Sequence, residues 1–213
     1  MIKKALIITD VQKDFCPGGS LATRDGNKIV PIINKIVEDH DFEKIVITQD
    51  WHPKHHKSFA SNYDDREPYD SIETEIGVDN LWPDHCVAGS EGAEFHDDLN
   101  TDPAHLIIRK GSNPGLDSYS TFLENDQATP TGLIGYLSDH EIREVYLCGI
   151  ATDVCIYYSA LDAIKFGFDT FVIVDATAGV DVPAGNIDKT IADMRAKGVT
   201  IIESKNLKAQ LHE

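Results

Sequence analysis

The sequence of 213 residues has little positive charge, few cysteines and no long hydrophobic run. No stretch approaches the roughly 18 apolar residues of a membrane-spanning helix, and the apolar run at residues 5–8 is too short for a secretory signal peptide. We therefore expect neither a membrane protein nor a secreted one. Lysine and arginine total 19 against 36 acidic residues, which gives a formal charge of −17. Such an acidic surface repels phosphate backbones, so we expect no nucleic-acid partner.

The cysteines and glycines lack the spacings of common binding motifs. The four cysteines, at positions 16, 86, 148 and 155, form no CxxC pair, which favours free thiols in a reducing cytoplasm. No GxGxxG pattern follows the first apolar segment, so a dinucleotide site, and with it a dehydrogenase, is not expected. No internal repeat or low-complexity linker divides the chain, and its length suits one core. Residues 1–213 are thus predicted to form a single domain.

Short apolar segments alternate with helical patterns along the chain. The apolar segments are too short for helices and indicate six strands buried on both faces, at residues 4–10, 44–50, 105–110, 145–148, 168–175 and 199–203. Helical patterns lie between them, at residues 27–38, 131–139, 152–166 and 183–197. This alternation predicts an α/β fold in which a six-stranded parallel sheet lies between two helical layers, as in Rossmann-like proteins. A long polar segment, residues 51–104, interrupts the pattern, and a loop of this length is usually functional.

Reactive side chains stand at the ends of four predicted strands. The first strand ends at Asp10, the second at Asp50 and the third at Lys110. The fourth leads through Gly149 into a helix that begins near Cys155. Acids, lysines and helix caps are common at strand ends for structural reasons alone. In an open parallel sheet, however, ligands bind beyond the carboxyl ends of the strands, and four such groups at one edge favour a catalytic site.

Cys155 has the surroundings of a nucleophile. Thr152 is predicted to cap the helix, with its hydroxyl accepting a first-turn N–H group, which places Cys155 three residues further on. The positive end of the helix dipole stabilises a thiolate there and lowers the thiol pKa. A free cysteine is more often a small buried hydrophobic residue, so this interpretation depends on the neighbouring groups.

Asp10 and Lys110 supply what a reactive Cys155 needs. Asp10 can accept the thiol proton and later return it to a departing ammonia, while Lys110 stabilises the thiolate and the carboxylate. An acyl carbon attacked by Cys155 would place its oxyanion near the backbone N–H groups of Ala151 and Cys155. These residues therefore predict a hydrolytic site built on a thiol, an ammonium and a carboxylate.

A second cluster, Asp50-Trp51-His52, offers metal ligands. Residues two apart in an extended segment point the same way, and a carboxylate with an imidazole suits zinc, iron or manganese. His85 has the most constrained setting in the long polar segment, because Trp82 and Pro83 lie beside it. A third ligand has to come from that segment, where the candidates are His55, His56, His85 and Cys86.

The order of these motifs resembles a known family. The segments that carry the resemblance are Asp10-Val-Gln-Lys-Asp-Phe-Cys-Pro-Gly-Gly-Ser-Leu21, Gln49-Asp-Trp-His-Pro53, Trp82-Pro-Asp-His-Cys86, Arg109-Lys-Gly111 and Gly149-Ile-Ala-Thr-Asp-Val-Cys155. They are similar, in the same order, to the motifs of the nicotinamidases, in the isochorismatase-like cysteine hydrolase superfamily. The resemblance extends from residue 4 to about residue 203.

The resemblance implies an isochorismatase-like hydrolase fold and a defined site. It implies a cis peptide bond before Ala151 at the oxyanion hole. It implies Phe15 and Trp82 as aromatic walls for the substrate ring, although packing beneath the long loop also explains them. It implies one divalent metal ion, with zinc favoured and iron or manganese as alternatives. The catalytic triad would be Asp10, Lys110 and Cys155, and the metal ligands would be Asp50, His52 and His85.

The implied reaction is hydrolysis of a small molecule, nicotinamide, to nicotinate and ammonia through a cysteine thioester, as part of NAD salvage, with pyrazinamide as a second substrate. Another small amide is the alternative within the superfamily, and a non-enzymatic metal- or pyridine-binding module is the alternative outside it. The metal ligands argue against the first and the intact triad against the second.

The acidic insertion at residues 62–80 is expected to act as a lid or as a homo-oligomer contact. A fourth metal ligand is left open among His55, His56 and Ser58.

Overall fold

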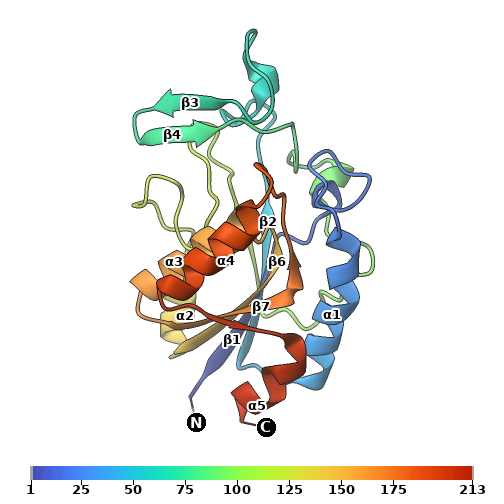
Figure 1. Cartoon of the computed structure of the whole chain (residues 1–213), viewed down its shortest axis with the longest axis vertical. Helices are drawn as coiled ribbons and strands as arrows, with labels where there is room; N and C mark the ends of the chain where they lie inside the picture. Colours follow the sequence, from blue (N-terminus) through green and yellow to red (C-terminus); the bar gives the residue numbers. More distant parts are fainter. Residues whose placement is uncertain (1, 213) are drawn as a thin grey trace.

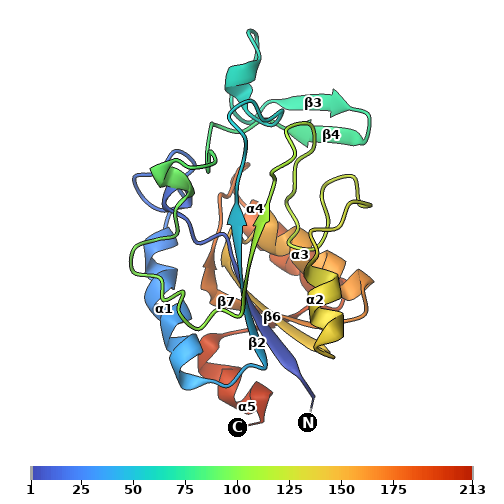
Figure 2. The ribbon, with the colours of Figure 1, turned by 180° about the vertical axis from the view of Figure 1, so that it is seen from behind.

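The computed structural model describes residues 2–212 and contains a six-stranded parallel sheet (Figures 1 and 2). The strands lie in the order β5-β2-β1-β6-β7-β8, and every neighbouring pair is parallel. The predicted strands and their parallel arrangement are confirmed, with ends that differ slightly. Their bounds are Lys4–Thr9 (β1), Lys44–Asp50 (β2), Leu106–Lys110 (β5), Glu144–Ile150 (β6), Asp169–Ala178 (β7) and Thr200–Ile202 (β8).

Helices cover both faces of the sheet, which confirms the three-layer α/β/α architecture. One face carries α1 (Gly26–Asp39) and the short α5 (Leu207–Leu211). The other face carries α2 (Leu133–Asp139), α3 (Cys155–Lys165) and α4 (Asn186–Ala196). Figure 1 shows α1 and α3 on opposite sides of the strands. Within residues 2–212, no helix has both the length and the apolar character needed to cross a membrane.

The strands divide their side chains between two hydrophobic cores. In β1, Leu6 and Ile8 belong to the core beneath α1, while Ala5 and Ile7 belong to the core beneath α2, α3 and α4. This alternation follows from the period of two along a strand, and it explains why the strand sequences are apolar throughout. A sheet buried on both faces leaves only its ends for polar chemistry.

Two helices begin later than the sequence patterns predict. The α3 helix begins at Cys155, because residues 152–154 form a turn. The α4 helix begins at Asn186, because the left-handed Gly185 at its N-cap turns the chain first. Gly185 has a φ of 89°, a conformation that glycine adopts without steric cost.

The segment at residues 51–104 is not wholly irregular. It contains two 3-10 helices, Ala60–Asn62 and Glu91–Ala93, and an antiparallel hairpin of β3 (Ser71–Thr74) and β4 (Gly77–Asn80). This hairpin gave no signal in the sequence, because its strands have four residues each and lack a buried apolar face. Figure 1 shows the hairpin beyond the end of the main sheet, separate from its strands.

Candidate active site

The carboxyl ends of the strands bring the predicted reactive side chains together. β2 ends at Asp50 and β5 at Lys110, and the sheet register pairs these two residues directly. Asp10 follows β1, which lies on the other side of β2, and its φ of 49° turns the chain out of the sheet. β6 ends one residue before Ala151, and Cys155 opens α3. The four groups therefore meet at one edge of the sheet.

Lys110 lies at the centre of a buried ion cluster. Its Nζ is 2.9 Å from Asp10 Oδ2 and 2.5 Å from Asp50 Oδ1, and it donates to the Ser118 carbonyl at 2.8 Å. The Cys155 Sγ is 3.6 Å from the same nitrogen. Burial alone would lower the pKa of Lys110, but the two carboxylates raise that pKa well above its ordinary value, so the ammonium stays charged. One cation thus serves both the predicted triad and a predicted metal ligand.

Asp10 has the surroundings of a proton acceptor. Its side chain is fully buried, Oδ1 accepts a hydrogen bond from the Thr48 hydroxyl at 2.6 Å, and Oδ2 faces Lys110. Burial raises the pKa of Asp10 to about 6; the Lys110 charge opposes this rise and the Asp50 charge adds to it. A carboxyl group with this pKa is largely ionised at neutral pH yet holds a proton readily, which suits a group that takes up and returns a proton.

Cys155 contacts the ion cluster, but two predictions about it are wrong. Thr152 does not cap α3: Val154 holds the N-cap position, and the Thr152 hydroxyl donates to the Thr177 hydroxyl instead. The thiol pKa is not lowered either. Burial raises the pKa of Cys155 well above its ordinary value, and the Lys110 charge offsets this only in part. The resting thiol is therefore protonated, and it needs a base before it can attack.

The turn before Cys155 presents two backbone N–H groups. The Ile150–Ala151 peptide bond is cis, as the resemblance implied. The Ala151 carbonyl accepts hydrogen bonds from the N–H groups of Val154 and Ile156, which hold the turn in place. Among residues 2–212, no backbone carbonyl accepts a hydrogen bond from the N–H of Ala151 or Cys155. Both N–H groups thus stay available for the predicted oxyanion hole.

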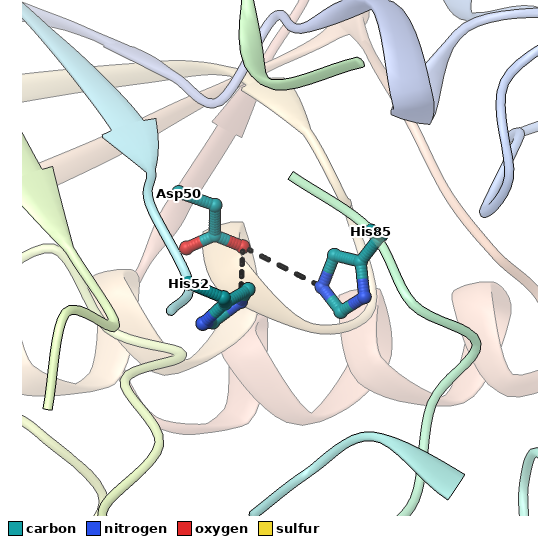
Figure 3. A group of neighbouring side chains, drawn as sticks. All are labelled: Asp50, His52 and His85. Carbon is teal, nitrogen blue, oxygen red and sulfur yellow. Dashed lines mark ion pairs between the residues drawn. The ribbon is translucent and has the colours of Figure 1, made fainter. Parts of the chain in front are cut away.

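Asp50, His52 and His85 face one another beside the ion cluster (Figure 3). The Nε2 atoms of His52 and His85 lie 3.5 Å and 3.9 Å from the same oxygen, Asp50 Oδ2. The Nδ1–H of His52 donates to the Gly111 carbonyl at 2.9 Å, and that of His85 to the Pro83 carbonyl at 2.7 Å. These hydrogen bonds place a proton on each Nδ1 and direct both Nε2 atoms toward Asp50.

This donor set fits a divalent metal ion. One oxygen and two nitrogen atoms all lie within 4.8 Å of one another, and all three side chains are buried. Burial and the His52 charge lower the pKa of His85 to about 4, so this imidazole is neutral, as a metal ligand must be. Burial opposes ionisation of Asp50, but Lys110 and His52 hold its pKa far below the usual range. A neutral imidazole and an ionised carboxylate are the forms that bind zinc, iron or manganese.

The other candidate ligands are placed differently. His56 is buried, but its Nδ1 lies 2.7 Å from the Ser58 hydroxyl and its Nε2 lies 3.3 Å from the Leu116 carbonyl, so both nitrogens have partners. His56 also groups with His52 and Asp117, a buried carboxylate that the sequence analysis missed. In the part of the chain that the structure describes, neither His55 nor Cys86 joins a cluster of metal-binding groups.

A pocket opens between the metal-binding group and Cys155. Phe15 and Trp82 both line it, where the resemblance placed aromatic walls. The Trp82 indole N–H donates to the Tyr119 hydroxyl at 3.1 Å, which holds the indole against the pocket. Because Tyr119 follows Lys110 by only nine residues, its position after a strand end was the signal that could have identified it. The lining residues missed from the sequence are Leu21, Asp117, Tyr119, Val154 and Val180.

The fold and this site define a class: a cysteine hydrolase of three-layer α/β/α architecture, whose thiol lies beside a buried ion cluster at the carboxyl edge of a parallel sheet. Within that class, the chain belongs to the isochorismatase family, because the family model described as Isochorismatase domain matches residues 4–206.

Comparisons with known proteins point to one activity within the family. The chain is similar to the nicotinamidase of Acinetobacter baylyi, with 47% identity over 203 residues that cover 95% of this chain and 94% of that protein. It is similar to a solved Acinetobacter baumanii nicotinamidase and pyrazinamidase, with a TM-score of 0.93, 47% identity, and coverage of 97% and 99% of the two chains. A pyrazinamidase of Pyrococcus horikoshii in complex with zinc has a TM-score of 0.76, 33% identity, and coverage of 94% and 99%.

Proposed function

We propose that this protein hydrolyses nicotinamide to nicotinate and ammonia through a thioester on Cys155. The observation that carries the proposal is the shared position of Lys110, which lies 3.6 Å from the Cys155 thiol and also contacts the carboxylates of Asp10 and Asp50. This arrangement joins a nucleophile, a base and a metal-binding group within one pocket. The similarity to nicotinamidases supplies the substrate, and pyrazinamide is expected to be hydrolysed as well.

The first half of the reaction forms the thioester. Asp10 takes the thiol proton, and Lys110 stabilises the thiolate as the sulfur attacks the amide carbon. The negative charge that develops on the amide oxygen is stabilised by the N–H groups of Ala151 and Cys155. Asp10 then returns the proton to the amide nitrogen, the C–N bond breaks, and ammonia leaves.

The second half of the reaction uses the same groups with water in place of the thiol. Asp10 removes a proton from a water molecule, whose oxygen attacks the thioester carbon. The C–S bond breaks, and the proton that Asp10 holds passes to the departing Cys155 sulfur. The acid product ionises and leaves as nicotinate, and Cys155 is again a protonated thiol. One water is consumed for each ammonia released.

Asp50, His52 and His85 would hold the metal ion beside this machinery. Bound there, the ion would supply a Lewis acid that anchors the pyridine nitrogen of the substrate. Zinc is proposed because two imidazoles and one carboxylate match its preferred ligands, and because a related pyrazinamidase is described in complex with zinc. Iron or manganese is the alternative outcome of a metal analysis.

The pocket walls orient the ring. Phe15 lies against His85, with ring centroids 5.4 Å apart, and Trp82 is held by Tyr119. Flat apolar walls favour an aromatic ring, because ring faces and edges pack well against one another. We assign Phe15 and Trp82 to substrate binding, with a role in orienting the amide toward Cys155.

Ammonia release by the purified protein tests the proposal. Nicotinamide and pyrazinamide are expected to be hydrolysed, and benzamide, which lacks the ring nitrogen, is expected to be hydrolysed far more slowly. A chelator is expected to remove activity, and zinc, iron or manganese to restore it. No ammonia from nicotinamide, although the protein carries metal, would contradict the proposed reaction. Full activity after complete removal of metal would keep the reaction and contradict the anchoring role.

The cellular setting is a smaller part of the proposal. All four cysteines are free thiols, and Cys155 has to stay reduced to act as a nucleophile. We infer a reducing, cytoplasmic setting, where nicotinamide hydrolysis would serve NAD salvage. We expect an oxidant to inactivate the enzyme and a thiol reductant to restore its activity.

A further inference from the structure

The backbone N–H and carbonyl groups of Asp50, at the end of β2, lie beyond the end of β1, the neighbouring strand that would pair with them. In β2, the Thr48 carbonyl accepts a hydrogen bond from the Asp10 N–H on the β1 side, whereas the Trp51 N–H donates to Lys110 on the β5 side. Because the backbone groups of a strand alternate sides, those of Asp50 face the β1 side. β1 ends at Thr9, and the chain turns away at Asp10. Asp50 therefore has no strand to pair with on that side.

The side chain of Gln12 takes the place of the missing strand. Its Oε1 accepts a hydrogen bond from the Asp50 N–H at 2.7 Å, and its Nε2 donates to the Asp50 carbonyl at 2.8 Å. The second hydrogen of Nε2 goes to the Ala93 carbonyl at 2.9 Å. Gln12 is fully buried, so no water competes for these bonds. One carboxamide thus satisfies both backbone groups of a single residue.

We propose that Gln12 is a positioning residue that fixes Asp50 for metal binding. The inference rests on the proposed metal site of Asp50, His52 and His85. The Asp50 carboxylate divides its oxygens between Lys110, at 2.5 Å from Oδ1, and the two imidazoles, which face Oδ2. A small shift of the Asp50 backbone would move Oδ2 away from the imidazoles while the ion pair with Lys110 persisted, because the ion pair lies on the other oxygen.

Gln49 provides a matched control within the same strand. It is buried, it precedes Asp50, and its Nε2 donates to the same Ala93 carbonyl at 2.8 Å. Its Oε1 accepts from Arg109 at 3.1 Å, and none of its hydrogen bonds reaches the Asp50 backbone. Replacing either glutamine by leucine leaves buried polar groups unpaired, so both variants are expected to lose stability. Only the Gln12 variant should also remove the hydrogen bonds to the Asp50 backbone.

The test measures the dissociation constant of Zn²⁺ for the metal-stripped full-length protein, by competition with a chromophoric chelator. We expect Gln12→Leu to bind zinc about tenfold to a hundredfold more weakly than the wild type, the usual effect of losing a group that orients a metal ligand. Gln49→Leu should stay within about twofold of the wild-type constant, since its ligand geometry is unchanged. Gln12→Asn keeps a carboxamide that is one methylene too short, and it serves as the second variant if Gln12→Leu does not fold.

Three outcomes would overturn the inference. The first is a wild-type zinc constant in the Gln12 variants. The second is an equal weakening in Gln49→Leu, which would assign the effect to general loss of buried hydrogen bonds. The third is a wild-type protein that releases ammonia from nicotinamide but binds no divalent ion, which would leave the proposed reaction in place. Chemical denaturation of each metal-stripped variant reports the stability loss separately, so weak binding cannot be confused with partial unfolding.

Discussion

The sheet edge and the β3–β4 hairpin lie near each other but are built on different principles. At the edge, Asp10, Asp50 and Lys110 are all buried. Each lies at or directly after the end of a strand whose register is set by the neighbouring strands. The hairpin is mostly exposed, and Val78 at its turn end is 71% exposed. Its links to the body include the Lys57–Asp79 ion pair at 3.2 Å and the Asn125–Asp79 hydrogen bond at 3.2 Å. The reactive groups thus lie in the buried, strand-anchored region, whereas the hairpin is held by fewer contacts at its exposed surface.

Replacing a lysine in each region should give the largest difference between the two regions, measured as the free energy of unfolding. Lys110→Met leaves the buried carboxylates of Asp10 and Asp50 without their partner, which should lower the free energy of unfolding by about 3–5 kcal/mol and abolish ammonia release. Lys57→Met breaks a partly buried pair in which Asp79 keeps its hydrogen bond from Asn125, so it should cost less, about 1–2 kcal/mol. Urea denaturation compares the two variants. Equal losses would mean that the fully buried cluster contributes no more than the partly buried Lys57–Asp79 pair.

The decrease in activity at acid pH should depend on the sheet edge and not on the hairpin. Burial raises the pKa of Asp10 to about 6, against the opposing charge of Lys110, and only the ionised carboxylate can take the thiol proton. The value of kcat/KM for nicotinamide should therefore fall as the pH drops below about 6, approaching tenfold for each further pH unit. Steady-state kinetics across the acid range measures this. A rate that stays constant well below pH 6 would rule out Asp10 as the base.

The wall of the pocket offers a smaller effect. Trp82→Phe keeps an aromatic face but loses the indole hydrogen bond to the Tyr119 hydroxyl, which should raise KM for nicotinamide about fivefold with little change in kcat. Tyr119→Phe removes the same bond from the other side and should give a similar increase. The double variant should add little to either single one. Fully additive effects would show that the two side chains contribute independently.

The hairpin should give the smallest effect. Val78→Ser, at an exposed position, is expected to change the free energy of unfolding by no more than about 0.5 kcal/mol and to leave kcat and KM unchanged. Thermal denaturation and nicotinamide kinetics check both. A joint change in kcat and KM would support the prediction that the insertion is a lid, and a change in sedimentation would support the prediction of an oligomer contact.

The sequence was most informative where side chains follow buried strands. Apolar segments that end in Asp10, Asp50 and Lys110 sufficed to predict both the strands and their common edge, because parallel strands have to end on the same side. The direct pairing of Lys110 with Asp50 could not be predicted, because it depends on a register between strands sixty positions apart. The raised pKa of Cys155 could not be predicted either, since it follows from tertiary burial of the thiol, which no local pattern near Cys155 reports.

The remaining errors lie in short polar segments. Thr152 matched the pattern of a helix cap, but its hydroxyl has a competing partner in Thr177, a residue of β7 that no local signal connects to it. The hairpin strands are short and exposed, so their pairing leaves no hydrophobic periodicity to detect. The organisation of residues 1–213 as one domain stays a prediction.

Replacing one buried thiol at a time shows whether Cys155 is the nucleophile. Cys155 and Cys148 are both buried, but Cys148 lies within β6, with its sulfur 3.9 Å from the Ile7 carbonyl and outside the pocket. Cys155→Ala should fold normally and release no ammonia from nicotinamide above the uncatalysed rate, whereas Cys148→Ala should keep most of the wild-type turnover. Wild-type ammonia release by folded Cys155→Ala would show that the reaction does not pass through a thioester on Cys155.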